Sequence, residues 1–319
     1  MSSFWYAILG VLLVAYFALG GLDQGVAMLL ATIRGNDERR RALNAIGPMF
    51  LGNEVWIVGA IGVLVAAFPR VEGELFGAAY PVIAVTVLAL LLLNASVQLR
   101  SRGRRSGGFD LVITVSGVAL ALGWGLLLGV LLHGAPVTAD GHVHGFAPLA
   151  DPLVWATGVA NVLLVLTHGA AFLSWRLADA RMRRTVRWLG PVAAGVVLLV
   201  AGGWWLSAPD GIRNPLIGTL LAVATAVAVG VAGRFGFAAT LVACALPVLA
   251  VASALYPTVL ASTVDPGATV TVDDAAAGGD TLRLLAFGAA PLLPVLVAVQ
   301  VSCWWLFRQR ERVPTPLYW

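Results

Sequence analysis

Long apolar runs separated by short polar segments dominate the chain. Crossing a hydrocarbon core takes about 20 helical residues, and nine runs reach about that length. Runs such as AVTVLALLLL and AAGVVLLVAG are apolar on every face, which excludes the alternating strands of a membrane β-barrel. The pattern therefore predicts nine transmembrane helices, at about residues 4–33, 50–69, 74–99, 109–133, 152–176, 185–207, 215–232, 235–256 and 281–307.

Composition places the whole chain in the membrane class. Only 11% of its 319 residues are charged and 60% are apolar, whereas a soluble domain carries about a quarter charged residues. Neither a nucleotide-binding loop nor a nucleophile elbow is present, so no self-contained enzyme is visible. Residues 1–319 are therefore predicted to form one all-α integral membrane domain.

The positions of the basic residues predict the orientation. All 20 are arginines, and all but Arg70, Arg213 and Arg283 lie in the connectors on one side of the predicted helices. Because cytoplasmic loops are enriched in positive charge, this side is expected to face the cytoplasm, with the N-terminus outside and the C-terminus inside. The net charge of +4 then belongs to a membrane face, and no nucleic-acid partner is expected.

Histidines and cysteines give weak signals. His133, His142 and His144 gather in the predicted outer segment GAPVTADGHVHGFAPLAD, and an H-x-H pair can bind metal. No fourth ligand stands at a fixed spacing, so we expect a solvated loop and no metal site. Cys244 and Cys303 lie inside predicted helices, where packing is favoured over a disulfide.

Three ionisable groups stand out inside the predicted helices, away from their ends: Asp23, Glu54 and His168. A carboxylate at mid-bilayer costs at least a few kcal/mol, so it usually faces a partner group or a water-filled cavity. At a rise of 1.5 Å per residue, the three groups lie about 15, 6 and 12 Å from the predicted cytoplasmic end. This shared depth favours a route by which protons enter from the cytoplasm. The alternative is that each group only satisfies a neighbouring helix or a partner subunit.

Next to Glu54, Gly52 and Asn53 suggest a polar entry to the second helix. Trp56 is more simply a packing or interfacial aromatic residue.

The segments GLDQGVA at 21–27 and GNEVW at 52–56 together resemble subunit II of the cytochrome bd-type quinol oxidases, which carries a GFDLGVG-like segment followed by GNEVW. AAFP at 66–69, THGAAFL at 167–173 and the YP pair at 256–257 correspond as well. The resemblance runs from end to end, and the nine-helix plan agrees with that family.

This resemblance implies a heterodimer in the bacterial cytoplasmic membrane. A larger subunit I is expected to hold two haems b and one haem d and to oxidise quinol, while this chain binds no haem and no metal. The family role for subunit II is a scaffold that contributes to cytoplasmic proton supply, with quinone or lipid as candidate ligands and small accessory subunits as further partners. On this basis Asp23, Glu54 and His168 are the proton-pathway candidates, and Gly52, Asn53 and Trp56 support the family motif.

Two departures bear on the proton route. The family usually has an acid before GNEVW and another near the end of the third helix, where this chain has Leu51 and Gln98. A route through those acids would be interrupted here unless water or the partner subunit substitutes.

Two other functions remain open from the sequence. A proton-coupled secondary transporter would show Gly- or Pro-broken helices at equivalent positions of two halves, and we find no such pairing. A non-catalytic membrane scaffold is the second alternative.

Overall fold

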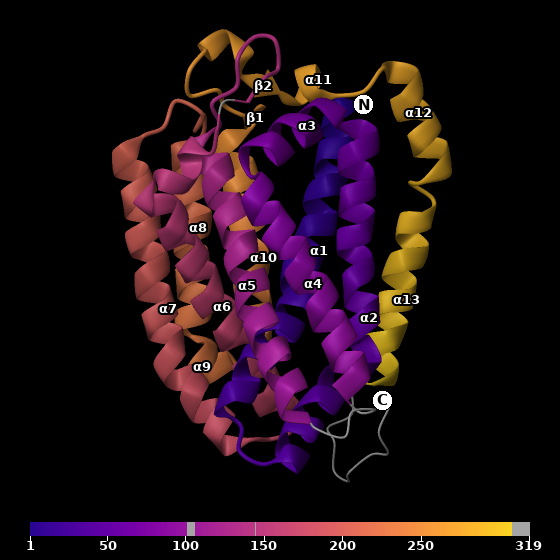
Figure 1. The fold of residues 1–319 in the computed structure, drawn as a ribbon, viewed down its shortest axis with the longest axis vertical. Coiled ribbons are helices and arrows are strands. Elements are labelled where there is room, and N and C mark those ends of the chain that lie inside the picture. The colour runs from indigo at the N-terminus through magenta and orange to yellow at the C-terminus, as the bar shows by residue number, and fades with distance from the viewer. Residues whose placement is uncertain (101–105, 144, 308–319) are drawn as a thin grey trace.

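The computed structural model describes residues 1–100, 106–143 and 145–307, which form an elongated bundle of helices (Figure 1). Within these ranges, seven helices are long and apolar enough to cross a membrane, which confirms the helical membrane class. They are α1 (Ser2–Leu29), α2 (Asn36–Ala67), α4 (Tyr80–Arg100), α5 (Ser106–His133), α6 (Pro152–Arg176), α7 (Ala180–Ser207) and α10 (Phe237–Leu255).

Two further apolar segments depart from the predicted spans. The segment predicted at 281–307 is divided into α12 (Gly279–Gly288) and α13 (Leu292–Leu306), bent by 40°. Pro291 stands at the break, where proline removes a backbone donor and restricts the preceding residue. The segment predicted at 215–232 forms α8 (Pro215–Gly230), which is shorter than the seven long helices. The count of nine crossings therefore stays a prediction.

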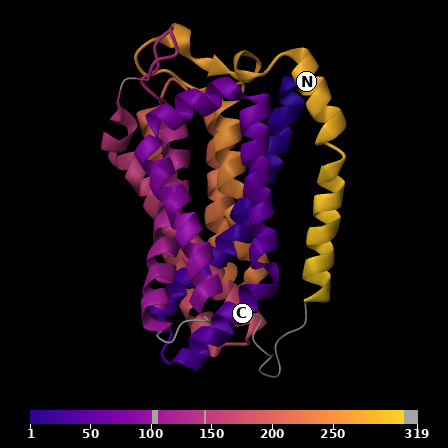
Figure 2. The ribbon, with the colours of Figure 1, turned by 45° about the vertical axis from the view of Figure 1, so that its right-hand side comes forward.

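The end of the bundle that holds the N-terminus carries short elements between the long helices (Figures 1 and 2). We call it the loop end. Two short strands at this end, Thr258–Leu260 and Val270–Thr271, pair antiparallel, with Thr258 opposite Thr271 and Leu260 opposite Val270. The predicted start of the third helix at 74 is wrong, because a separate short helix begins at Pro69. The elements are α3 (Pro69–Ala78), η2 (Ala147–Ala150), β1 (Thr258–Leu260), η3 (Pro266–Ala268), β2 (Val270–Thr271) and α11 (Val272–Ala275).

The opposite end gathers the connectors that carry most of the described arginines, and we call it the arginine-rich end. It holds η1 (Leu30–Thr32), α9 (Ala232–Phe235) and the start of α2. The start of α2 corrects the sequence prediction, which placed a connector before residue 50. Apolar side chains at helical spacing hold this extra length against the core; they are Ala42, Leu43, Ala45, Ile46 and Met49.

The early start of α2 changes the position assigned to Glu54. Counted from Asn36, Glu54 lies 18 residues into the helix, about 27 Å along its axis. The expected depth of about 6 Å was counted from a helix start near residue 50; that start is wrong, and the depth of Glu54 in the membrane stays a prediction.

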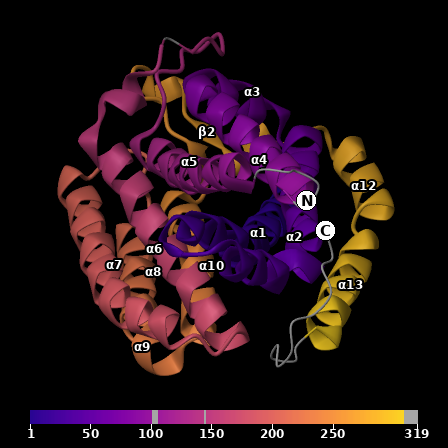
Figure 3. The same ribbon diagram turned by 60° about the horizontal axis from the view of Figure 1, so that its bottom comes forward.

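Helix α1 lies at the centre of the bundle, surrounded by α2, α5, α6 and α10 (Figure 3). Its closest approach is to α6, where Gly25 faces Gly169. A Cβ on Gly25 would collide with the carbonyl oxygen of Val165 and the backbone of Gly169, and a Cβ on Gly169 would collide with the backbone of Gly25 and Val26. Small residues permit such close contact where lipid supplies no hydrophobic drive between helices.

Gly25→Ala is therefore expected to destabilise the bundle by about 1–3 kcal/mol, because the added methyl group meets rigid backbone. The measurement is the thermal unfolding midpoint of the purified protein in detergent. Gly10→Ala on the same helix is the control, since a Cβ there meets nothing within 4 Å. Equal midpoints for the two variants would show that α1 and α6 are not packed this closely.

Candidate functional site

The carboxylate of Asp23 is buried at the centre of the bundle, with 4% of the residue exposed. Its Oδ2 atom accepts a hydrogen bond of 2.9 Å from Nδ2 of Asn53 on α2. Its Oδ1 atom is also buried and has no hydrogen-bond partner among the described residues. Such a buried oxygen is a position where a bound water is expected.

Asn53 connects Asp23 to a third helix. It is fully buried, and its Oδ1 atom accepts a 2.9 Å hydrogen bond from Nε2 of Gln300 on α13. The interpretation of Asn53 as a helix entry is wrong, because α2 has already run for more than four turns at this point. Sequence reasoning missed Gln300 altogether, although a lone glutamine inside an apolar span was a usable signal.

Glu54 follows Asn53 on α2 and therefore points about 100° around the helix. Its Oε1 atom accepts a hydrogen bond from Nδ2 of Asn94 on α4, and Asn94 also donates to the carbonyl oxygen of Leu90 at 3.0 Å. Glu54 is half-buried and lies close enough to Asp23 for the two carboxyl groups to interact electrostatically. The structure thus brings Asp23 and Glu54 into one region. Asn53 on α2 bonds to Asp23 of α1, and Glu54, the next residue of α2, bonds to Asn94 of α4.

His168 lies apart from this pair. Its ring is fully buried, with Nε2 at 2.9 Å from the carbonyl oxygen of Ala18 and Nδ1 at 2.9 Å from Oγ1 of Thr240. A carbonyl oxygen only accepts, so Nε2 is the donor to Ala18. The Thr240 hydroxyl donates to the carbonyl oxygen of Phe237 at 2.9 Å. The ring also stacks on Phe237, with centroids 5.1 Å apart. Both nitrogens are thus occupied by protein groups of α1 and α10.

A second polar group on α1 lies beside Asp23. Gln24 is buried, and its Nε2 atom donates to the hydroxyl of Tyr16 at 3.3 Å. The indole Nε1 of Trp124 on α5 donates to the same hydroxyl at 3.2 Å. Sequence reasoning did not single out Tyr16 and Trp124, because aromatic residues in an apolar helix are usually packing residues.

Trp56 and Gly52 flank the central residues of α2. Trp56 packs in the hydrophobic core, and its indole Nε1 has no hydrogen-bond partner among the described residues. Gly52 lies against Gln300, whose Oε1 would be 3.5 Å from a Cβ at that position. Leu51 and Gln98, which occupy positions where the family usually has acids, are both exposed on the outside of this chain.

At the arginine-rich end, a buried acid holds three helices together. Asp110 at the start of α5 binds Arg100 through Nε at 2.5 Å and Nη2 at 3.3 Å, and binds Arg39 on α2 at 3.0 Å. Arg100 also donates to Asn36 at 2.8 Å. Two guanidinium groups on one carboxylate compensate the cost of burying it.

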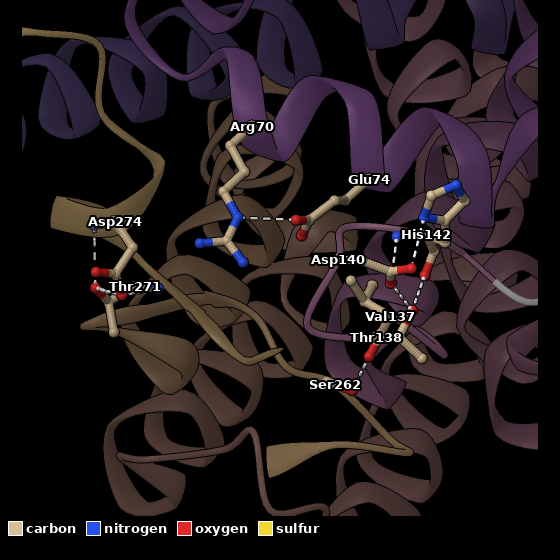
Figure 4. Close-up of polar contacts among 9 residues, drawn as sticks. All are labelled: Arg70, Glu74, Val137, Thr138, Asp140, His142, Ser262, Thr271 and Asp274. Carbon is tan, nitrogen blue, oxygen red and sulfur yellow. Dashed lines mark hydrogen bonds and ion pairs between the residues drawn. The ribbon is translucent and has the colours of Figure 1, made fainter. Parts of the chain in front are cut away.

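At the loop end, polar side chains of α3 lie near polar side chains of the neighbouring loops (Figure 4). Nε of Arg70 donates to Oε1 of Glu74 at 2.8 Å, and Glu74 is buried. Across from this pair, hydrogen bonds from the hydroxyl of Thr138 and the backbone N–H of His142 lower the pKa of the Asp140 carboxyl. The described residues contain no group of three or more His, Cys, Asp or Glu side chains placed to hold a metal.

Two of the three histidines of the predicted outer segment each lie beside an aspartate. His133 lies 3.6 Å from Asp151 and His142 lies 3.0 Å from Asp140, while His144 falls outside the described residues.

The loop that follows α10 is closed by local hydrogen bonds (Figure 4). Thr271 caps α11 and exchanges hydrogen bonds with Asp274. Bonds from the hydroxyl and the backbone N–H of Thr271 lower the pKa of the Asp274 carboxyl. Oγ of Ser262 donates to the carbonyl oxygen of Val137 at 2.6 Å, which joins this loop to the one that follows α5.

Comparison with known proteins gives a consistent result. The family model for cytochrome bd terminal oxidase subunit II matches residues 1–307. The chain is 28% identical to the cytochrome bd-I ubiquinol oxidase subunit 2 of Escherichia coli strain K12, over 94% of this chain and 92% of that protein. It is 27% identical to the cytochrome bd ubiquinol oxidase subunit 2 of Bacillus subtilis, over 99% and 98%. Its fold matches a chain of the bd oxidase from Geobacillus thermodenitrificans, with a TM-score of 0.75 at 18% identity, over 97% of this chain and 99% of that one.

Asp110→Asn is expected to destabilise the protein by about 3 kcal/mol or more, because it leaves the buried Arg100 without its carboxylate partner. Thermal unfolding in detergent measures the effect. Asp37→Asn is the control, since Asp37 is exposed at the same end of the bundle. An Asp110→Asn protein as stable as this control would mean that the ion pairs are not formed.

Proposed function

Because the chain belongs to the cytochrome bd terminal oxidase subunit II family, we propose that it supplies cytoplasmic protons to the haem-bearing subunit I of a quinol oxidase. Subunit II of this family works in a complex with subunit I, and the chain is a multi-pass protein of the bacterial cytoplasmic membrane. The resemblance seen in GLDQGVA and GNEVW is confirmed, and the transporter alternative is not favoured. The observation that carries the proposal is the Asp23 carboxylate, buried at the centre of the bundle with one oxygen unpartnered among the described residues.

The proposal includes nine membrane crossings with the N-terminus outside and the C-terminus in the cytoplasm. The two ends of the bundle support this orientation, because Arg39 and Arg100 lie at the arginine-rich end while Arg70 and Arg283 lie at the loop end (Figure 1). Counting α8 and the bent pair α12 and α13 as crossings completes the nine.

The chemistry requires a wet path through an otherwise dry bundle. Reduction of oxygen to water consumes protons, and taking them from the cytoplasm while quinol releases its own outside builds a proton-motive force. Buried carboxyl groups suit such a path, because they bind water and exchange protons when neighbouring dipoles stabilise both states. Asp23 and Glu54 interact electrostatically and are bonded to the amides of Asn53 and Asn94, which supplies these dipoles.

The path runs inside the chain and does not use the positions of Leu51 and Gln98. Both side chains are exposed on the outside of this chain, away from the buried Asp23. His168 takes the structural alternative in this proposal, since its two nitrogens join α6 to α1 and α10.

We also propose that an apolar cavity binds a quinone or a lipid chain. The cavity has a volume of about 430 Å³ and lies among α1, α2, α4, α5 and α10. Its wall is apolar with a few polar groups, which is typical of sites for long apolar ligands. Tyr6, Phe17, Thr86 and Trp124 are among the lining residues. Small accessory subunits stay a prediction.

Asp23→Asn in the assembled oxidase is expected to lower quinol oxidase turnover by about tenfold or more, because an amide cannot take up and release the proton. Glu54→Gln should lower it by a smaller factor, since Glu54 is only half-buried. Oxygen consumption with a soluble quinol measures turnover, and haem content measures assembly.

The control is Asp280→Asn, because Asp280 is fully exposed on α12 and pairs only loosely with Arg283 at 3.5 Å. Wild-type turnover in a fully haem-loaded Asp23→Asn oxidase would rule out the route through this carboxyl group.

A second prediction concerns assembly. The chain expressed alone should insert into membranes but show no quinol oxidase turnover, because the haems belong to subunit I. Co-expression with subunit I should yield a complex that carries haem absorption bands and oxidises quinol. Turnover by the isolated chain would contradict this division of roles.

A further inference from the structure

Helix α13 contacts the bundle through an unusual residue. Gln300 is the one residue of α13 that is buried, whereas its neighbours Val299 and Val301 are 62% and 61% exposed. Polar side chains buried between membrane helices hydrogen-bond across them. Here a primary amide is placed in the interior, next to the chain of polar groups that ends at Asp23.

The hydrogen bonds along this chain have a direction. Gln300 donates from Nε2 to Oδ1 of Asn53, and Asn53 donates from Nδ2 to Oδ2 of Asp23, with both bonds 2.9 Å long. Each amide carries donors on one atom and an acceptor on the other. In this direction the Asn53 amide donates to Asp23, which suits an ionised carboxylate because it only accepts hydrogen bonds.

The Gln300 amide also fits its surroundings with its oxygen and nitrogen exchanged. Nε2 then donates to the carbonyl oxygen of Gly52 at 3.3 Å, and Oε1 accepts from Nε1 of Trp304 at 3.2 Å. This orientation turns an oxygen toward Asn53, so the Asn53 amide must rotate as well and donate to Gln300. Oδ1 of Asn53 then faces Oδ2 of Asp23, and these two oxygens form a hydrogen bond only when Asp23 carries a proton.

We propose that Gln300 is a positioning residue for Asp23, and that the amides of Asn53 and Gln300 reverse direction together as Asp23 gains or loses its proton. The inference rests on the proton route proposed above. The amides keep their own hydrogens and only rotate, and Asp23 exchanges its proton with water. Each protonation state of Asp23 is thereby matched by one orientation of the two amides. In neither state does an amide donor face a donor or an amide oxygen face an acceptor.

The other titratable groups around Asp23 are few. Glu54 on α2 and Tyr16 on α1 interact with it electrostatically, and His168 on α6 is held by α1 and α10. The described part of α13 adds only Cys303, which donates to the carbonyl oxygen of Pro48. Gln300 does not ionise, so Gln300→Leu removes no titratable group, and Gln300→Glu adds one whose ionisation sets the direction of the amide hydrogen bonds.

The test compares the pH profile of oxygen consumption for Gln300→Leu and Gln300→Glu in the assembled oxidase. Gln300→Leu removes donor and acceptor together, and turnover should fall by about tenfold at every pH. Gln300→Glu keeps the length of the side chain. Its protonated carboxyl group both donates and accepts, so turnover should stay near that of the wild type at acidic pH. When the carboxyl group introduced by Gln300→Glu ionises, it only accepts hydrogen bonds. The Asn53 amide must then donate to it and turn its oxygen toward Asp23, the orientation that needs a protonated Asp23. Turnover should therefore decline as pH rises.

Val301→Leu, on the exposed side of the same helix, is the control, and haem content shows assembly. If Asp23→Asn is impaired while Gln300→Leu keeps wild-type turnover and pH profile, Gln300 does not position the acid. Equal impairment of Gln300→Leu and Gln300→Glu at every pH, with haem retained, shows a purely structural role and also overturns the inference. If Gln300→Leu does not assemble, the pH profile of Gln300→Glu decides alone. Wild-type turnover in Asp23→Asn removes the proton route itself, and the inference with it.

Discussion

A carboxyl group inside an apolar helix bundle must be satisfied by the protein around it, and this constraint organises the centre of the molecule. Asp23 receives one hydrogen bond from Asn53, which in turn is bonded to Gln300, so one buried acid joins α1, α2 and α13. Without these partners the acid would cost several kcal/mol in such a setting. The same bonds make it useful, because groups that stabilise both protonation states let a buried acid exchange a proton.

Close packing and charge neutralisation support this centre from outside. The contact of Gly25 with Gly169 brings α6 against α1 and fixes the position of the helix that carries Asp23. At the arginine-rich end, Asp110 is neutralised by Arg39 and Arg100, which ties the ends of α2, α4 and α5 together. These interactions fix how the helices around Asp23 pack against one another.

Much of the fold could be predicted from apolar runs, but the long-range pairs could not. The helix predicted at 152–176 has those bounds, because Pro152 starts it and the side chain of Asp151 caps it. The early start of α2 was missed because its arginines suggested a connector, while the apolar residues between them pack on the core. Asp23 and Glu54 stood out as isolated charges. Gln300 is a lone polar residue in an apolar span, but its pairing with Asn53 could not be predicted, because the two residues are 247 positions apart.

The central claim is that Asp23 changes its protonation state while the oxidase works. Infrared difference spectra between the oxidised and reduced enzyme test it most directly, because a protonated carboxyl group has a distinct C=O stretching band. The account predicts a carboxyl band that disappears in the Asp23→Asn enzyme and remains in the Asp280→Asn enzyme. Identical carboxyl bands in the wild-type and Asp23→Asn enzymes would contradict it.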